Sequence, residues 1–87
     1  MTKEELKEKL LLTITEFTHY KSDEIDLMKS FEITGLDSMD FLDMLNEFQK
    51  KIKYNIPDSI LDKITRTSTM NDCIDEIYKL YTDARNP

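Results

Sequence analysis

One hydroxyl group in this chain, that of Ser38, is placed where a serine could be chemically modified. Ser38 follows Gly35, the chain's one glycine, and opens a strongly amphipathic segment. Glycine tolerates positive φ angles, and a serine at a helix start presents its side chain beside unpaired backbone N–H groups. A phosphate ester on this hydroxyl would lie at the positive end of a helix dipole. A turn glycine followed by an Asp or Ser cap also begins many ordinary helices, so these residues alone favour a structural role.

The other reactive side chains lack the partners that catalysis requires. Cys73 recurs among apolar residues at helical spacing, so we expect a buried, inert thiol. His19 is the chain's one histidine, and we expect it to interact with the C-terminal end of a helix dipole. Carboxylates on a solvent-facing helix surface lack the desolvation that tunes a general acid or base. A small hydrolase using Asp37, Asp40 or Cys73 therefore has little support, and we expect no metal site.

Helical periodicity predicts the elements that position Ser38. Thr2 and Glu5 match a capping box at the start of the first helix. The long connection before Ser38 loses this periodicity, and we expect Phe31 and Ile33 to anchor it in the core. Pro57 restarts the chain into a short helix, and Thr69 or Ser68 caps the last one. The predicted helices cover about 3–18, 39–53, 60–64 and the chain from about 70, with a connection over 20–37 and a polar linker over 65–69.

The second predicted helix has two different faces. At 100° per residue its apolar residues fall on one side and its carboxylates on the other. Met39 and Met44 lie at the margins, where flexible thioethers suit contacts with a partner or cover the edge of the core. The apolar residues are Phe41, Leu42, Leu45, Phe48 and Ile52, and the carboxylates are Asp40, Asp43 and Glu47.

Length and charge limit the classes of function. The 87 residues suit a single domain, 1–87, that is too small to enclose a deep catalytic cavity easily. The net charge is -6, and residues 22–47 contain eight acidic side chains against one lysine. Such a surface attracts basic protein surfaces and repels nucleic acid, although it could simply maintain solubility. One cysteine and the absence of a long apolar run predict a cytoplasmic protein without membrane insertion.

Taken together, these features resemble an acyl carrier protein over essentially the whole length. Residues Gly35-Leu36-Asp37-Ser38-Met39-Asp40 are similar to the family's Gly-x-Asp-Ser-Leu-Asp, and Ile56-Pro57-Asp58 follows at the family's spacing. The resemblance implies an all-α, four-helix bundle of three long helices and one short helix, with a long first loop. It also implies a monomer.

The same resemblance implies the function. Ser38 would be the attachment point for 4′-phosphopantetheine, added from coenzyme A by a separate phosphopantetheinyl transferase that needs magnesium. The protein would hold acyl groups as thioesters for partner enzymes of fatty-acid or specialised acyl and polyketide synthesis, and would not itself be an enzyme. Synthases and transferases with basic patches would dock on Asp37, Met39, Asp40, Asp43, Met44 and Glu47. An acyl chain would lie in a cavity lined by Leu42, Phe48, Ile52, Ile56, Leu61 and Ile64.

Some positions depart from the family pattern. Thr34 replaces a Leu before the glycine, so Ile33 or Leu36 would take over its packing role. Asn46 replaces an apolar partner-facing residue, and the usually acidic helix end contains Gln49, Lys50 and Lys51. These changes predict a partner set that differs from that of the housekeeping fatty-acid carrier. A dedicated aminoacyl or D-alanyl carrier and a non-carrier acidic helical adaptor remain as alternatives.

Overall fold

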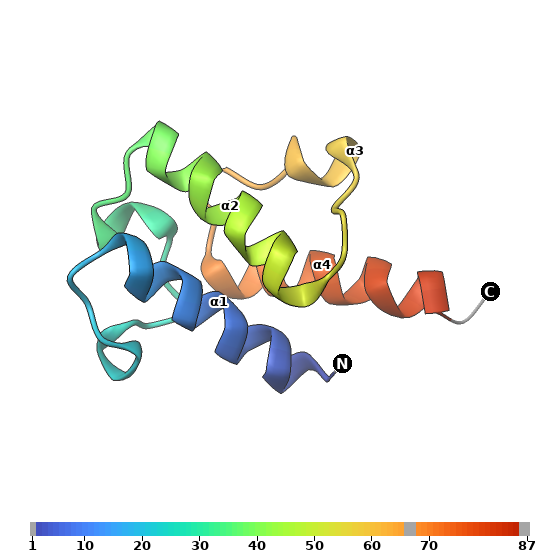
Figure 1. Ribbon diagram of the computed structural model, residues 1–87, viewed down its shortest axis with the longest axis horizontal. Coiled ribbons are helices and arrows are strands. Elements are labelled where there is room, and N and C mark those ends of the chain that lie inside the picture. The colour runs from blue at the N-terminus through green and yellow to red at the C-terminus, as the bar shows by residue number, and fades with distance from the viewer. Residues whose placement is uncertain (1, 66–67, 86–87) are drawn as a thin grey trace.

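This computed structural model describes residues 2–65 and 68–85, which contain three long helices and one short helix (Figure 1). The all-α prediction is confirmed: these residues contain no strand, and Ser30 and Thr69 form an isolated bridge. The centre of the predicted polar linker, residues 66–67, lies outside the described residues. The helices are α1 (Lys3–Phe17), α2 (Ser38–Ile52), α3 (Asp58–Leu61) and α4 (Met70–Arg85), with 3₁₀ turns η1 (Ser22–Glu24) and η2 (Phe31–Thr34) in the first connection.

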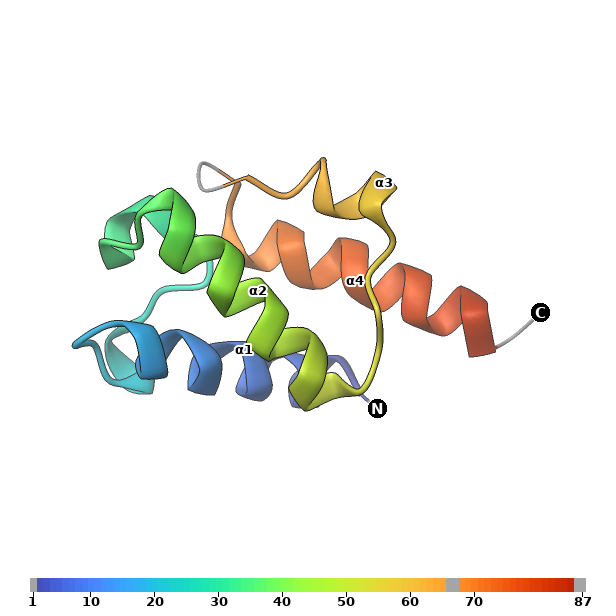
Figure 2. The same ribbon diagram turned by 45° about the horizontal axis from the view of Figure 1, so that its top comes forward.

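The long helices surround one core, and two of them run in one direction while the third runs the opposite way. α1 runs opposite to α2 and α4, and α2 crosses the other two obliquely (Figures 1 and 2). The start of α2 therefore lies at the same end of the molecule as the end of α1, and the end of α2 lies at the opposite end. None of the described helices is both long and apolar enough to cross a membrane.

Side-chain caps explain where two of the helices begin. Thr2 Oγ1 accepts the N–H of Glu5, and Glu5 Oε1 accepts the N–H of Thr2, both at 3.2 Å, which confirms the capping box. The hydrogen bond from the Thr2 backbone holds the pKa of Glu5 below its ordinary value. Thr69 Oγ1 accepts the N–H of Asp72 at 3.0 Å, so Thr69 is the cap of α4.

The core is a single cluster to which all three long helices contribute. Cys73 lies inside this cluster, as expected, and burial raises the pKa of its thiol to about 12. Partly exposed ion pairs at the rim join Lys51 to Glu16 at 2.9 Å and Lys3 to Asp75, and pairs near the surface add little stability. The buried apolar residues are Leu6, Leu10, Ile14, Phe31, Leu36, Phe41, Met44, Leu45, Phe48, Ile52, Ile56, Ile60, Ile64, Met70, Cys73, Ile74 and Ile77.

The first connection is anchored differently from the prediction. Phe31 is fully buried, but Ile33 is 50% exposed, so the prediction for Ile33 was wrong. Side chains three residues apart eclipse in a 3₁₀ turn, so Thr34, rather than Ile33, follows Phe31 into the interior. The Thr34 hydroxyl donates to the Phe31 carbonyl at 2.6 Å, which satisfies it there. Leu36 takes the other buried position.

Backbone hydrogen bonds tie this connection to the start of α4. The N–H of Met70 donates to the carbonyl of Lys29 at 3.0 Å, and that of Asn71 donates to Leu27 at 2.8 Å. These N–H groups have no partner within the helix, because the first turn of any helix lacks preceding carbonyls. These hydrogen bonds thereby hold the segment that leads to Ser38 against α4.

Candidate functional site

The turn before α2 aims Ser38 into solvent. Gly35 adopts φ = 82°, in the left-handed region, and ends η2. A Cβ there would meet nothing within 4 Å, so the backbone angle and not a close approach requires glycine. Asp37 is the N-cap: its Oδ1 accepts the N–H of Asp40 at 2.8 Å, and its carbonyl accepts the N–H of Phe41 at 2.9 Å. Ser38 is the first residue of α2.

Packing beneath the turn fixes its position. Leu36 is buried directly before the cap, and the rings of Phe31 and Phe41 meet edge to face with centroids 5.0 Å apart. The second ring belongs to the first turn of α2, so the contact joins the loop to the helix that begins at Ser38. Packed side chains therefore anchor both the loop before Ser38 and the helix that it begins.

The Ser38 side chain fits the attachment of a bulky phosphate ester. It is exposed, and among the described residues no hydrogen bond or ion pair holds its hydroxyl. Because Asp37 supplies the cap, substitution of the serine oxygen would not remove a helix-stabilising hydrogen bond. The neighbouring N–H groups and the helix dipole favour negative charge at this point.

The predicted carboxylates lie on α2 beside this serine. Asp37 and Asp43 are exposed, whereas Asp40 and Glu47 are half-buried. Glu47 pairs with Lys50 at 3.0 Å, one turn along the helix. We call Asp37, Asp40, Asp43 and Glu47 the acidic face. It lies beside Ser38 at one end and beside Lys50 at the other.

Two residues of α2 were assigned to the wrong side. Met44 is fully buried in the core, so its side chain cannot contact a docking partner. Leu42 is 60% exposed and does not line the interior, contrary to the predicted cavity. Met39 is 76% exposed, as a partner contact requires. Leu42, one turn beyond Met39, thus forms an exposed apolar pair with it, which the sequence analysis missed because both edges of the apolar stripe look alike.

The remaining predicted cavity residues pack in or against the core. Phe48, Ile52, Ile56 and Ile64 are buried, and Leu61 is partly buried against them. Gln49 helps to hold this region, because its Oε1 accepts the N–H of Ile56 at 2.7 Å. An acyl chain that entered here would have to displace these side chains.

The helical bundle and the exposed serine at the head of α2 have the form of a small carrier domain. A family model described as "phosphopantetheine attachment site" matches residues 8–74, which is well over half of the chain. The chain belongs to this family, whose domains are the site of covalent 4′-phosphopantetheine attachment and serve as carriers rather than catalysts. Searches of curated proteins and of solved structures found no match.

Proposed function

We propose that Ser38 is the residue that receives 4′-phosphopantetheine, and that residues 1–87 act as an acyl carrier. The observation that supports this most directly is that the helix cap and the exposed hydroxyl belong to different residues at the start of α2. Asp37 caps the helix, and the adjacent Ser38 hydroxyl stays exposed and without a protein partner among the described residues. When attached, the group supplies a terminal thiol that holds acyl cargo as a thioester.

Around Ser38, the chain's own residues bind and orient partner enzymes. The acidic face attracts basic patches on a phosphopantetheinyl transferase and on acyl synthases or transferases. Met39 and Leu42 add exposed apolar contacts beside these charges. Charge sets the rate and orientation of docking, and apolar burial supplies affinity.

The cargo that we propose is an acyl intermediate of fatty-acid or specialised synthesis. A dedicated aminoacyl or D-alanyl carrier uses the same attachment chemistry and is the second candidate. The core residues Phe48, Ile52, Ile56, Leu61 and Ile64 are the ones that an acyl chain would displace if it entered the interior. A non-carrier adaptor is disfavoured, because the chain belongs to a family of attachment domains.

The attachment site is tested by mass spectrometry. Wild-type protein is incubated with a promiscuous phosphopantetheinyl transferase, coenzyme A and magnesium, and we expect one added arm that maps to Ser38. The Ser38→Ala variant should gain nothing. Ser59→Ala is the matched control, because Ser59 is also exposed near a helix start and should not be needed for modification. An unmodified wild type, or an adduct that persists in Ser38→Ala, would refute the assignment.

The cargo is tested on the modified protein. A malonyl transferase with malonyl coenzyme A and a D-alanine ligase with D-alanine and ATP are offered in parallel reactions, and the loaded mass is measured. We expect loading by the acyl enzyme and none by the D-alanine ligase. The reverse result would establish the aminoacyl alternative.

A further inference from the structure

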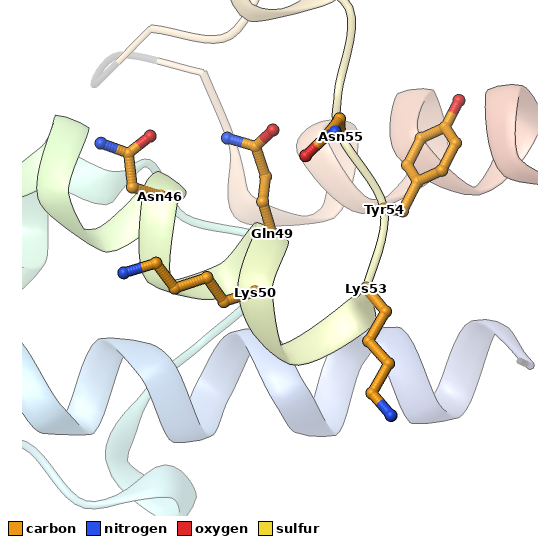
Figure 3. A pocket seen from close by; sticks show the side chains of 6 residues that line it. All are labelled: Asn46, Gln49, Lys50, Lys53, Tyr54 and Asn55. Carbon is orange, nitrogen blue, oxygen red and sulfur yellow. The ribbon is translucent and has the colours of Figure 1, made fainter.

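The far end of α2 contains a polar hollow that the carrier function above does not use. It has a volume of about 430 Å³ and is lined by Asn46, Gln49, Lys50, Lys53, Tyr54 and Asn55 (Figure 3). The lining contains three amides, two lysines and a tyrosine, and no carboxylate. We call it the amide–lysine hollow.

Hydrogen-bond donors outnumber acceptors in this hollow. Lysines donate only, and the Gln49 carbonyl oxygen is already taken by the N–H of Ile56, which leaves its NH₂ group to offer donors. Lys50 is held by Glu47 at 3.0 Å, but its side chain is 74% exposed, so another carboxylate can replace Glu47 at little cost. The complementary chemistry is therefore an acceptor-rich, negatively charged group.

The two lysines extend in different directions from the helix end (Figure 3). They do not converge on one point, as they would around a single bound phosphate. A segment that presents more than one carboxylate suits this spread better.

The hollow continues the surface on which partners of the proposed carrier would dock. At 100° per residue, Met39, Asp43, Asn46 and Lys50 follow one another along the exposed side of α2. From Met39 to Lys50 this strip is about 16 Å long at 1.5 Å per residue. Its charge changes from negative near Ser38 to positive at the hollow.

Lys53 occupies a backbone conformation that suits glycine better. It has φ = 54°, and the N–H groups of Lys53 and Tyr54 close the end of α2 on the carbonyls of Lys50 and Gln49. Glycine is the usual residue at this left-handed position. A lysine there adds a cation at the edge of the hollow, with its side chain extending away from the three amides (Figure 3), at a cost in backbone strain.

We propose that the amide–lysine hollow binds carboxylate side chains of a partner protein that presents a basic patch followed, about 16 Å away, by an acidic segment. The inference rests on the proposed carrier function, because it assumes docking along α2. The hollow would then discriminate among partners. Lys50 and Lys53 repel an enzyme whose docking patch is uniformly basic, whereas a partner whose basic patch is followed by an acidic segment is attracted along the whole strip.

Two synthetic helical peptides test the proposal. Both have an arginine-rich half, and one has two glutamates about 16 Å further along where the other has glutamines. Fluorescence anisotropy at low salt measures their dissociation constants. We expect wild-type protein to bind the glutamate peptide about threefold more tightly, as two exposed ion pairs allow. The net charge of -6 alone would produce the opposite order.

Variants separate the hollow from general charge effects. Lys50→Gln with Lys53→Gly should abolish the preference, and the glycine relieves strain, so loss of folding is not the cause. Lys21→Gln with Lys79→Gln is the matched control, because it removes two exposed lysines elsewhere and should retain the preference. In NMR spectra the glutamate peptide should shift the side-chain amide signals of Gln49 and Asn55.

The outcomes are distinguishable from failure of the carrier function. Equal affinities, undetectable binding of the glutamate peptide, or equal loss in the control would overturn the hollow's role. The Lys50 and Lys53 variant should still gain the arm on Ser38 in the mass assay. If wild-type protein gains no arm, the carrier function fails, and the peptide preference still reports on the hollow.

Discussion

The carboxylate of Asp37 accepts the backbone N–H of Asp40 at 2.8 Å, and this one hydrogen bond separates the structural and chemical roles at the head of α2. Either Asp37 or Ser38 could have capped the helix. Because the aspartate does so, the serine hydroxyl is available for modification while the helix start stays intact.

The cap predicts how stability responds at these neighbouring positions. Asp37→Ala should lower the free energy of unfolding by about 1 kcal/mol, because it removes a helix cap. Asp37→Asn keeps an accepting oxygen and should lose much less. Ser38→Ala should stay within about 0.5 kcal/mol of wild type in the same urea titrations. A larger loss in Ser38→Ala than in Asp37→Ala would contradict the assignment of the cap.

Two left-handed residues should respond to substitution in opposite directions. Gly35→Ala should lower stability by about 1 kcal/mol, through backbone strain alone since the added Cβ meets nothing within 4 Å. Lys53→Gly should raise stability by about 0.5 kcal/mol, because relief of strain outweighs the added freedom of the unfolded chain. Thermal and urea unfolding measure both. Destabilisation by Lys53→Gly would show that the lysine side chain contributes packing as well.

The acidic face predicts a salt-dependent association. Asp40→Lys with Asp43→Lys should slow modification by the phosphopantetheinyl transferase, measured as kcat/KM, and the wild-type rate should fall as salt rises. Glu8→Lys with Glu76→Lys changes the net charge equally on exposed positions of α1 and α4, and should have a smaller effect. Equal slowing by both pairs would mean that net charge, rather than this face, controls docking.

The buried thiol of Cys73 should be inert in the folded protein. A thiol reagent at neutral pH should label the unmodified protein only when it unfolds, whereas the protein with its arm should gain one rapidly reacting thiol. Stability should be independent of this group below about pH 9 and fall between pH 9 and 12, because the unfolded chain ionises at its ordinary pKa while the folded thiol keeps its proton up to a pKa of about 12. Rapid labelling of folded Ser38→Ala protein, which carries no arm, would contradict the burial of Cys73.

The two corrected positions on α2 should separate stability from docking. Met44→Ala should cost about 2 kcal/mol or more, because it leaves a void in the core. Leu42→Ala should change stability by less than about 0.5 kcal/mol but slow modification of Ser38, since its side chain is exposed beside Met39. Urea unfolding and the mass assay report the two effects. A large loss of stability in Leu42→Ala would show that the Leu42 side chain packs in the core.

Local patterns in the sequence were sufficient for the three long helices and for placing Ser38 at a helix start, whereas the short helix α3 ends at Leu61 and not at Ile64 as predicted. The role of Ser38 as an attachment point came from the resemblance of the whole chain to a carrier family. Each of the local patterns involves residues only a few positions apart, so it can be recognised without knowing the fold. They are the capping box at Thr2 and Glu5, the 3.6-residue periodicity and the glycine before the second long helix. For the same reason the burial of Cys73 could be predicted from its spacing alone.

Only the tertiary structure decided which edges of each element are covered. Leu42 and Met44 lie roughly 80° to either side of the centre of the apolar stripe, so periodicity treats them alike. The surrounding bundle covers Met44 and leaves Leu42 exposed. Likewise, the 3₁₀ turn buries Thr34 in place of Ile33, and the chain reversal after α2 gathers Gln49, Lys53 and Asn55 into one hollow. Such outcomes depend on contacts between distant segments, and spacing along the chain does not specify them.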